Sequence, residues 1–172
     1  SHLAASLQIP EEQYEAAAPS AMEDALTALA WLSGQAAARS LDMARLAVLG
    51  ASAGSITTLY AVYHSDDFGL EAPNVAAVIN LWGGFGFSAD ASALEAGEPP
   101  MFIVHGTADE AVPFFFAEAV AARAQEVGVY HEFYPLAGYK HGFAAIDVMT
   151  VQVDGMTIFE RMVRFLNLML NK

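Results

Sequence analysis

Short apolar runs alternate with helical patterns along most of this chain, and this alternation constrains the fold more than any other feature. An apolar run without polar alternation is typical of a strand buried on both faces of a parallel sheet. Strands are predicted at residues 46–49, 75–79, 101–104 and 131–134. Helices are predicted at residues 20–38, 54–63, 115–127 and roughly 156–170. Strands that alternate with helices predict an α/β fold with a doubly wound, mostly parallel sheet.

Local signals place several helix boundaries. Ser20 and Glu23 form a capping-box pattern, in which each side chain bonds to the backbone N–H of the other residue, so a helix is predicted to begin at Ser20 and to run to about Ala38. Gly128 is expected to end the helix over 115–127. The last helix has a broad apolar face that should dock on the sheet. The residues of that face are Ile158, Phe159, Met162, Val163, Phe165, Leu166 and Met169.

The composition excludes several classes of function. Seven Lys and Arg against 20 Asp and Glu give a net charge of −13, so a polyanion such as DNA, RNA or an acidic membrane surface would be repelled. The absence of cysteine excludes a disulfide scaffold, a thiolate metal site and a cysteine nucleophile. No apolar run reaches the roughly 18 residues of a membrane span. We therefore expect one soluble domain over residues 1–172, with a cytoplasmic location favoured and no nucleic-acid partner.

The pentapeptide Gly50-Ala51-Ser52-Ala53-Gly54 is a G-x-S-x-G pattern between an apolar run and a helical pattern. A serine on so tight a strand-to-helix turn projects its hydroxyl above the sheet, beside the positive end of the helix dipole. Larger side chains at either flank would collide with neighbouring strands, which explains glycine at both ends. Taken alone, the pentapeptide is equally compatible with an ordinary turn of small residues, because Gly, Ala and Ser are abundant in this chain.

Two further chemically active side chains follow predicted strands. Asp109 follows the strand at 101–104, and His141 follows the strand at 131–134. Singly, Asp109 reads as a turn residue or a helix cap, and His141 as a partly exposed loop histidine. Together with Ser52 they place a hydroxyl, a carboxylate and an imidazole past strand ends, in the chain order Ser, Asp, His. A serine hydroxyl is a poor nucleophile until a base takes its proton, and imidazole titrates near neutrality.

In these segments the sequence resembles the α/β-hydrolase superfamily, especially small serine carboxylesterases and the dienelactone-hydrolase-like branch. The resemblance rests on residues 50–54, on the segment 105–113, which reads His-Gly-Thr-Ala-Asp-Glu-Ala-Val-Pro, and on His-Gly-Phe at 141–143. It covers the chain from about residue 20 to its C-terminus.

The resemblance implies a role for each matched residue. Ser52 becomes the nucleophile, His141 the general base and acid, and Asp109 the residue that orients His141. The backbone N–H of Ala53 becomes one oxyanion donor. Glu110 is an alternative acid that is expected to cap or to face solvent. The remaining histidines read as structural, with His64 at a helix end, His105 beneath its loop and His131 at the start of a strand.

The resemblance is incomplete on the N-terminal side. The resemblance implies an eight-stranded sheet. It also implies a second oxyanion donor, which comes from a Gly-rich loop upstream of the nucleophile. That loop and the first three or four strands are missing here. The pair Gly83-Gly84 follows the turn at Ser52 in the chain, and a turn beside the acyl pocket is expected there. The strand from Leu46 to Leu49 would then have an open apolar edge. We expect a second chain with the N-terminal part of the fold, or a homodimer, to cover this edge.

The predicted activity is hydrolysis of small, uncharged carboxylic esters through an acyl-enzyme, without a metal or organic cofactor. Trp82, Phe85 and Phe143 are expected to form an apolar wall of the acyl pocket. Residues 85–90 read either as a short lip over the site or as aromatic packing beneath a helix. A peptidase or an acyltransferase with the same three residues is one alternative, and a noncatalytic α/β binding or dimerisation module is another.

Overall fold

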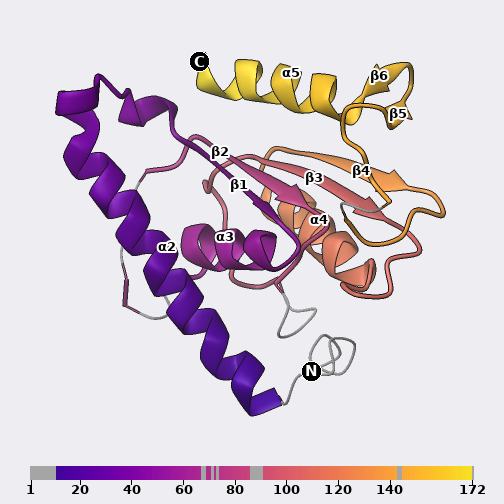
Figure 1. The fold of residues 1–172 in the computed structure, drawn as a ribbon, viewed down its shortest axis with the longest axis horizontal. Coiled ribbons are helices and arrows are strands. Elements are labelled where there is room, and N and C mark those ends of the chain that lie inside the picture. The colour runs from indigo at the N-terminus through magenta and orange to yellow at the C-terminus, as the bar shows by residue number, and fades with distance from the viewer. Residues whose placement is uncertain are drawn as a thin grey trace.

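The computed structural model describes residues 11–66, 69–70, 72, 74–85, 91–142 and 145–171. Four parallel strands form one sheet in the order β1-β2-β3-β4 (Figure 1). The strands are β1 (Ala47–Ala51), β2 (Ala77–Leu81), β3 (Met101–Gly106) and β4 (His131–Leu136). Because all four run in the same direction, their carboxyl ends lie along one edge of the sheet, and the loops that follow them meet there. The prediction of a mostly parallel α/β sheet is confirmed.

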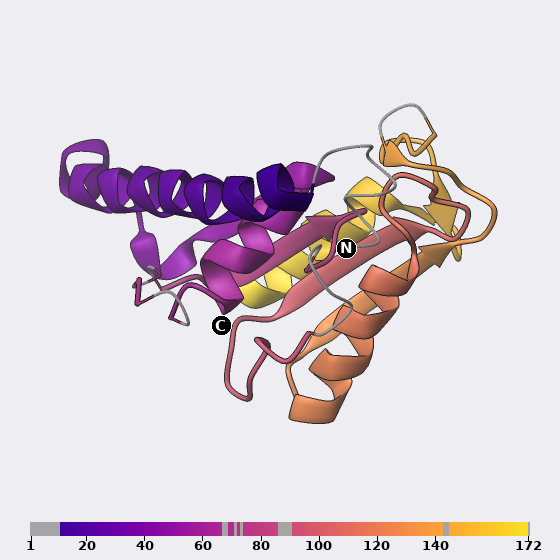
Figure 2. The ribbon, with the colours of Figure 1, turned by 90° about the horizontal axis from the view of Figure 1, so that it is seen from below.

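Helices cover both faces of this sheet (Figures 1 and 2). On one face lie α2 (Glu11–Arg39), α3 (Ala53–Tyr63) and α4 (Phe115–Val127), and on the other lies α5 (Ile158–Leu170). Each face buries its own apolar cluster, one containing Leu59 and Ile103 and the other containing Phe102 and Phe165. Successive residues of β3 enter opposite clusters, as the pleat of a strand requires. None of the described helices is both long enough and apolar enough to span a membrane.

The helix α2 begins earlier than the capping-box pattern predicts. It runs from Glu11 through Pro19 to Arg39, so Ser20 lies inside it and the predicted start at Ser20 is wrong. The segment 11–18 is rich in Glu and Ala, which favour a helix by themselves, and a Ser-x-x-Glu pattern does not stop a helix that has already begun. Met22 is fully buried in the core that α2 shares with α3.

β1 lies at one edge of the described sheet and pairs with β2 alone among the described strands. Leu49, in the middle of β1, is 56% exposed. The predicted burial of this strand on both faces is therefore wrong at Leu49, because α5 packs on β2 and leaves Leu49 uncovered. Within the described part of the chain, the sheet thus has an open apolar edge.

A short hairpin that the sequence patterns did not predict precedes α5. Its strands are β5 (Gln152–Val153) and β6 (Met156–Thr157), which pair antiparallel. A second short element, the 3-10 helix η1 (Met43–Arg45), precedes β1. The hairpin leads into a capping box, in which the Thr157 hydroxyl accepts from the Glu160 N–H and the Glu160 carboxylate accepts from the Thr157 N–H. This Thr-x-x-Glu pattern starts α5 at Ile158.

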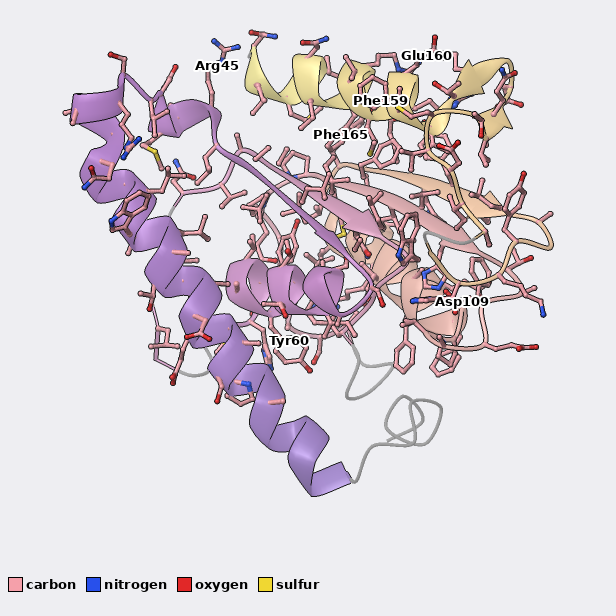
Figure 3. The ribbon with its side chains drawn as sticks, in the orientation of Figure 1. Arg45, Tyr60, Asp109, Phe159, Glu160 and Phe165 are labelled. Atoms are coloured by element: carbon pink, nitrogen blue, oxygen red, sulfur yellow. The ribbon has the colours of Figure 1, made fainter. Side chains whose placement is uncertain are left out.

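The buried face of α5 is narrower than its apolar sequence pattern predicts. Phe165 is fully buried and points from α5 toward the sheet (Figure 3). Phe159 and Val163 are 41% and 40% exposed, so they lie beside the contact rather than in it. The predicted docking of α5 on the sheet is confirmed, with Ile158, Met162 and Met169 also buried.

Candidate active site

Ser52 occupies the sharp turn that joins β1 to α3. Its backbone has φ 53° and ψ −124°, a left-handed conformation that is costly for a residue with a side chain. The Ser52 N–H donates to the Leu81 carbonyl at 2.9 Å, which fastens the turn to the end of β2. The Ser52 side chain does not cap the helix that follows. Its hydroxyl is therefore available to other partners at the carboxyl end of the sheet.

The two glycines beside Ser52 differ in their surroundings. A Cβ at Gly50 would lie 2.3 Å from the Gly54 carbonyl oxygen and 2.6 Å from the Ser55 Cα, so the turn requires glycine there. A Cβ at Gly54 would meet nothing within 4 Å among the described residues. The expectation that both glycines avoid neighbouring strands is therefore wrong in two respects. Only Gly50 is crowded, and it is crowded by the first turn of α3.

Asp109 lies in the loop that follows β3, at the end of the sheet opposite Arg45 (Figure 3). Its Oδ1 accepts the backbone N–H groups of Ala111 and Val112, both at 2.9 Å. Burial raises the pKa of Asp109, but hydrogen bonds from His105, His141 and the Val112 N–H outweigh it and hold the pKa below its usual value. The carboxylate is therefore ionised near neutral pH.

His141 lies between Ser52 and Asp109, in the loop that follows β4. Its Nδ1 is 2.7 Å from Asp109 Oδ2, and its Nε2 is 2.8 Å from Ser52 Oγ. An ionised carboxylate can only accept, so Nδ1 carries the hydrogen and Nε2 presents a lone pair to the serine hydroxyl. The structure thus brings the three residues into one hydrogen-bonded chain of hydroxyl, imidazole and carboxylate.

The loops after β3 and β4 are tied to each other, which fixes Asp109 relative to His141. The Ala108 N–H donates to the Tyr139 carbonyl at 3.0 Å, and the Gly138 N–H donates to Thr107 Oγ1 at 2.9 Å. A Cβ at Gly106 would lie only 2.3 Å from the Tyr139 carbonyl oxygen. Gly106 therefore permits the close approach of the two loops.

The first turn of α3 presents backbone N–H groups beside Ser52. The N–H groups of Ser55 and Ile56 both donate to the Ser52 carbonyl. Those of Ala53 and Gly54 come too early in the helix to have an intrahelical acceptor. With the helix dipole, they form a positive end that favours a negative charge near Ser52.

The three aromatic residues predicted to line the acyl pocket have different surroundings. Trp82 is 1% exposed in the core beneath α5, and a Cβ at Gly142 would lie 3.0 Å from its Nε1, so Trp82 supports the His141 loop from below. Phe85 is 3% exposed and packs in the opposite core, beside Tyr60. Phe143, and most of the segment 85–90, lie outside the described residues. Substrate contact by these side chains stays a prediction.

The other titratable candidates fall where the sequence suggested. Glu110 is exposed, whereas Asp109 contacts His141. His64 is the C-cap of α3, and His131 is the first residue of β4. His105 is fully buried beneath the loop, as expected, but it also contacts Asp109, which the sequence reasoning missed. In the part of the chain that the structure describes, no group of three or more His, Cys, Asp or Glu side chains is arranged to hold a metal ion.

This fold, with the strand-turn-helix around Ser52 and the two loops that carry Asp109 and His141, is that of an α/β hydrolase. Residues 13–93 match a family model described as "alpha/beta hydrolase fold". The family match and the geometry therefore agree on the α/β-hydrolase fold. No curated protein sequence matches the chain.

Several solved structures have a similar fold. The carboxylesterase Cest-2923 from Lactobacillus plantarum WCFS1 is 18% identical, with a TM-score of 0.65 over 85% of this chain and 66% of that one. MGS-M1, an α/β hydrolase from a Medee basin deep-sea metagenome library, is 21% identical, with a TM-score of 0.64 over 88% of this chain and 65% of that one. The esterase Est2 from Thermogutta terrifontis is 25% identical, with a TM-score of 0.60 over 85% of this chain and 62% of that one. The chain thus spans just under two thirds of the length of each.

Proposed function

We propose that this chain carries the catalytic residues of a serine hydrolase that acts on small, uncharged carboxylic esters. One observation carries the proposal: the hydrogen-bonded chain from Ser52 Oγ through His141 to Asp109 Oδ2, with contacts of 2.8 and 2.7 Å. The strained backbone of Ser52 supports it, since such strain collects at functional sites.

In the proposed reaction, Ser52 Oγ attacks the ester carbonyl while His141 Nε2 takes the hydroxyl proton. The carbonyl oxygen becomes an oxyanion, which the Ala53 N–H and the positive end of α3 stabilise. When the tetrahedral intermediate collapses, the C–O bond to the alcohol breaks and His141 returns its proton to the departing alkoxide. Water then attacks the acyl-enzyme with His141 again as base, which releases the acid and restores the Ser52 hydroxyl.

The substrate class rests on two arguments. Similar structures include proteins named carboxylesterase and esterase. The net charge of −13 disfavours the approach of anionic substrates. The proposal includes an apolar acyl pocket with Trp82, Phe85 and Phe143, and a cytoplasmic location.

We also propose that the open edge of β1 is covered in the working protein, by a chain with the N-terminal part of the fold or by a second copy. The exposure of Leu49 on a strand that pairs with β2 alone among the described strands supports this. Light scattering should report a dimer or a complex for the native sequence, and Leu49→Lys should shift it toward monomer. A monodisperse, stable monomer of the native chain would contradict the proposal.

The activity is tested with a series of p-nitrophenyl esters of increasing acyl length, and with matched p-nitroanilides for amide cleavage. Turnover of short esters is expected, and Ser52→Ala should abolish it without loss of the folded state. Ser33→Ala is the matched control, because Ser33 is exposed on α2 and its hydroxyl donates to the Leu29 carbonyl of its own helix. Undiminished hydrolysis by Ser52→Ala would remove Ser52 from the mechanism, and faster cleavage of the anilides would change the substrate class.

A further inference from the structure

His105 is a buried titratable side chain that the proposed reaction does not use. It lies on β3 with 0% exposure, and its Nε2 is 2.9 Å from the Val112 carbonyl oxygen and 3.2 Å from Asp109 Oδ2. The ring of Phe114 packs edge-on against it at 5.8 Å between centroids. A rigid strand and an aromatic neighbour therefore fix the position of the imidazole.

The contacts of His105 identify which nitrogen carries a hydrogen. A carbonyl oxygen only accepts, so the bond to Val112 requires a hydrogen on Nε2. The same N–H lies close enough to Asp109 Oδ2 to be shared between the two acceptors. Among the described residues, the buried Nδ1 has no hydrogen-bond partner. Among the described residues, the polar contacts that orient the ring are therefore those with Val112 and Asp109.

Asp109 receives donors on both of its oxygens. Oδ1 accepts two backbone N–H groups of its own loop, from Ala111 and Val112. Oδ2 accepts His141 Nδ1–H at 2.7 Å and faces the His105 N–H at 3.2 Å. His105 is the donor that comes from the sheet, so it ties the carboxylate to β3.

We propose, on the basis of the function proposed above, that His105 is a positioning residue for Asp109. Its N–H holds Oδ2 in line with His141 Nδ1 and stabilises the ionised carboxylate. A carboxylate with this additional donor is a weaker base, so the pair of Asp109 and His141 binds a proton less tightly.

The surroundings of Asp109 contain few other titratable groups. Of the described residues, His105 from β3 and His141 from the loop after β4 contact its carboxylate. Glu110 and Lys140, the chain neighbours of Asp109 and His141, are exposed, so solvent screens their charges. A change in the proton affinity of the pair on substitution of His105 is therefore assigned to the lost donor.

The matched substitutions are His105→Gln and His105→Asn. Both introduce an amide of similar polarity, but Gln places its N–H near the position of Nε2, whereas Asn is one methylene too short to reach Asp109. His105→Asn should lower kcat by about 10- to 100-fold with KM within about twofold, by analogy with groups that orient metal-binding ligands. The acid limb of the kcat/KM profile should move to higher pH. His105→Gln should retain most of the rate and the wild-type profile.

Two further measurements separate this proposal from its alternatives. Titration with a fluorophosphonate measures the concentration of functional active sites. kcat can then be calculated per active site, so a smaller folded fraction is not mistaken for a lower kcat. The downfield proton resonance of His141 Nδ1–H reports the bond to Asp109 in the absence of turnover. The midpoint pH of its titration should be higher in His105→Asn than in the wild type, and unchanged in His105→Gln. If the wild-type protein is inactive but this shift is present, the proposed function fails and the positioning role stands. Equal losses in both variants, with no movement of the acid limb or the resonance, would overturn the positioning role.

Discussion

Gly50→Ala is the substitution for which the structure gives the sharpest expectation. The added Cβ would lie 2.3 Å from the Gly54 carbonyl oxygen, 2.5 Å from the Gly54 carbonyl carbon and 2.6 Å from the Ser55 Cα. Ordinary contacts begin at 3.4 Å, so the shortfall is about 1 Å, and all three atoms belong to the backbone. No side-chain rotation can relieve the clash. The first turn of α3 must move away from β1, and Ser52 lies between them.

A displacement of this size acts on both stability and catalysis. Overpacking of this kind costs about 1–3 kcal/mol or more. A shift of about 1 Å would also break the 2.8 Å contact between Ser52 Oγ and His141 Nε2, and misplacement on that scale costs about 100-fold in rate. Gly50→Ala should therefore lower both Tm and kcat/KM for a short p-nitrophenyl ester.

Gly54→Ala is the matched control, because it adds the same methyl group at the other end of the same pentapeptide. Its Cβ would meet nothing within 4 Å among the described residues. It should keep kcat/KM within about twofold and raise stability by about 0.5–1 kcal/mol, as alanine is the better helix former. Wild-type activity and Tm in Gly50→Ala, or equal damage from both substitutions, would refute the reasoning.

Two other substitutions test the electrostatics. Burial and the nearby carboxylates Asp66 and Glu95 raise the pKa of Glu98 to about 7 despite a hydrogen bond from the Glu95 N–H, so the folded state keeps a proton that the unfolded state releases near its usual pKa of 4.5. Stability therefore falls as pH rises from about 4.5 to 7. Because the Glu98 carboxyl is only half buried, solvent screens part of this effect, so Glu98→Gln should stabilise by about 1–2 kcal/mol at pH 8 and not at pH 4. Denaturant unfolding measures this, and equal effects at both pH values would contradict it. Asp109→Asn should lower kcat by about 10⁴-fold with an unchanged circular dichroism spectrum, because the amide favours the wrong His141 tautomer, whereas Glu110→Gln should have little effect. The opposite ranking would assign the acid to Glu110.

The elements that the sequence predicts well are those with strong local signals. The helix α4 begins and ends at the predicted residues, because Gly128 adopts a left-handed conformation with φ 78° and terminates it. The order of Ser52, Asp109 and His141 past strand ends was readable because parallel strands bring such loops to one edge. The start of α2 could not be predicted, because a capping pattern in the sequence does not show whether a helix has already begun upstream.

Features that depend on packing between distant segments were not readable. The 56% exposure of Leu49 depends on where α5 docks, and α5 lies more than 100 residues further along the chain. The contact of His105 with Asp109 depends on how the loop after β3 folds back over the strand. The predicted need for Gly54 failed because helix geometry directs its Cβ position away from the described neighbours. In each case the local pattern was compatible with more than one outcome.

The central claim is that His141 and Asp109 activate Ser52 as a nucleophile, and covalent labelling with a fluorophosphonate tests it most directly. Intact-mass and peptide mass spectrometry should show a single adduct, on Ser52, for the native sequence. Ser52→Ala should show none, and His141→Ala should label far more slowly, because the hydroxyl then has no base within reach. An unlabelled native protein, or an adduct distributed over other serines at comparable rates, would contradict the claim.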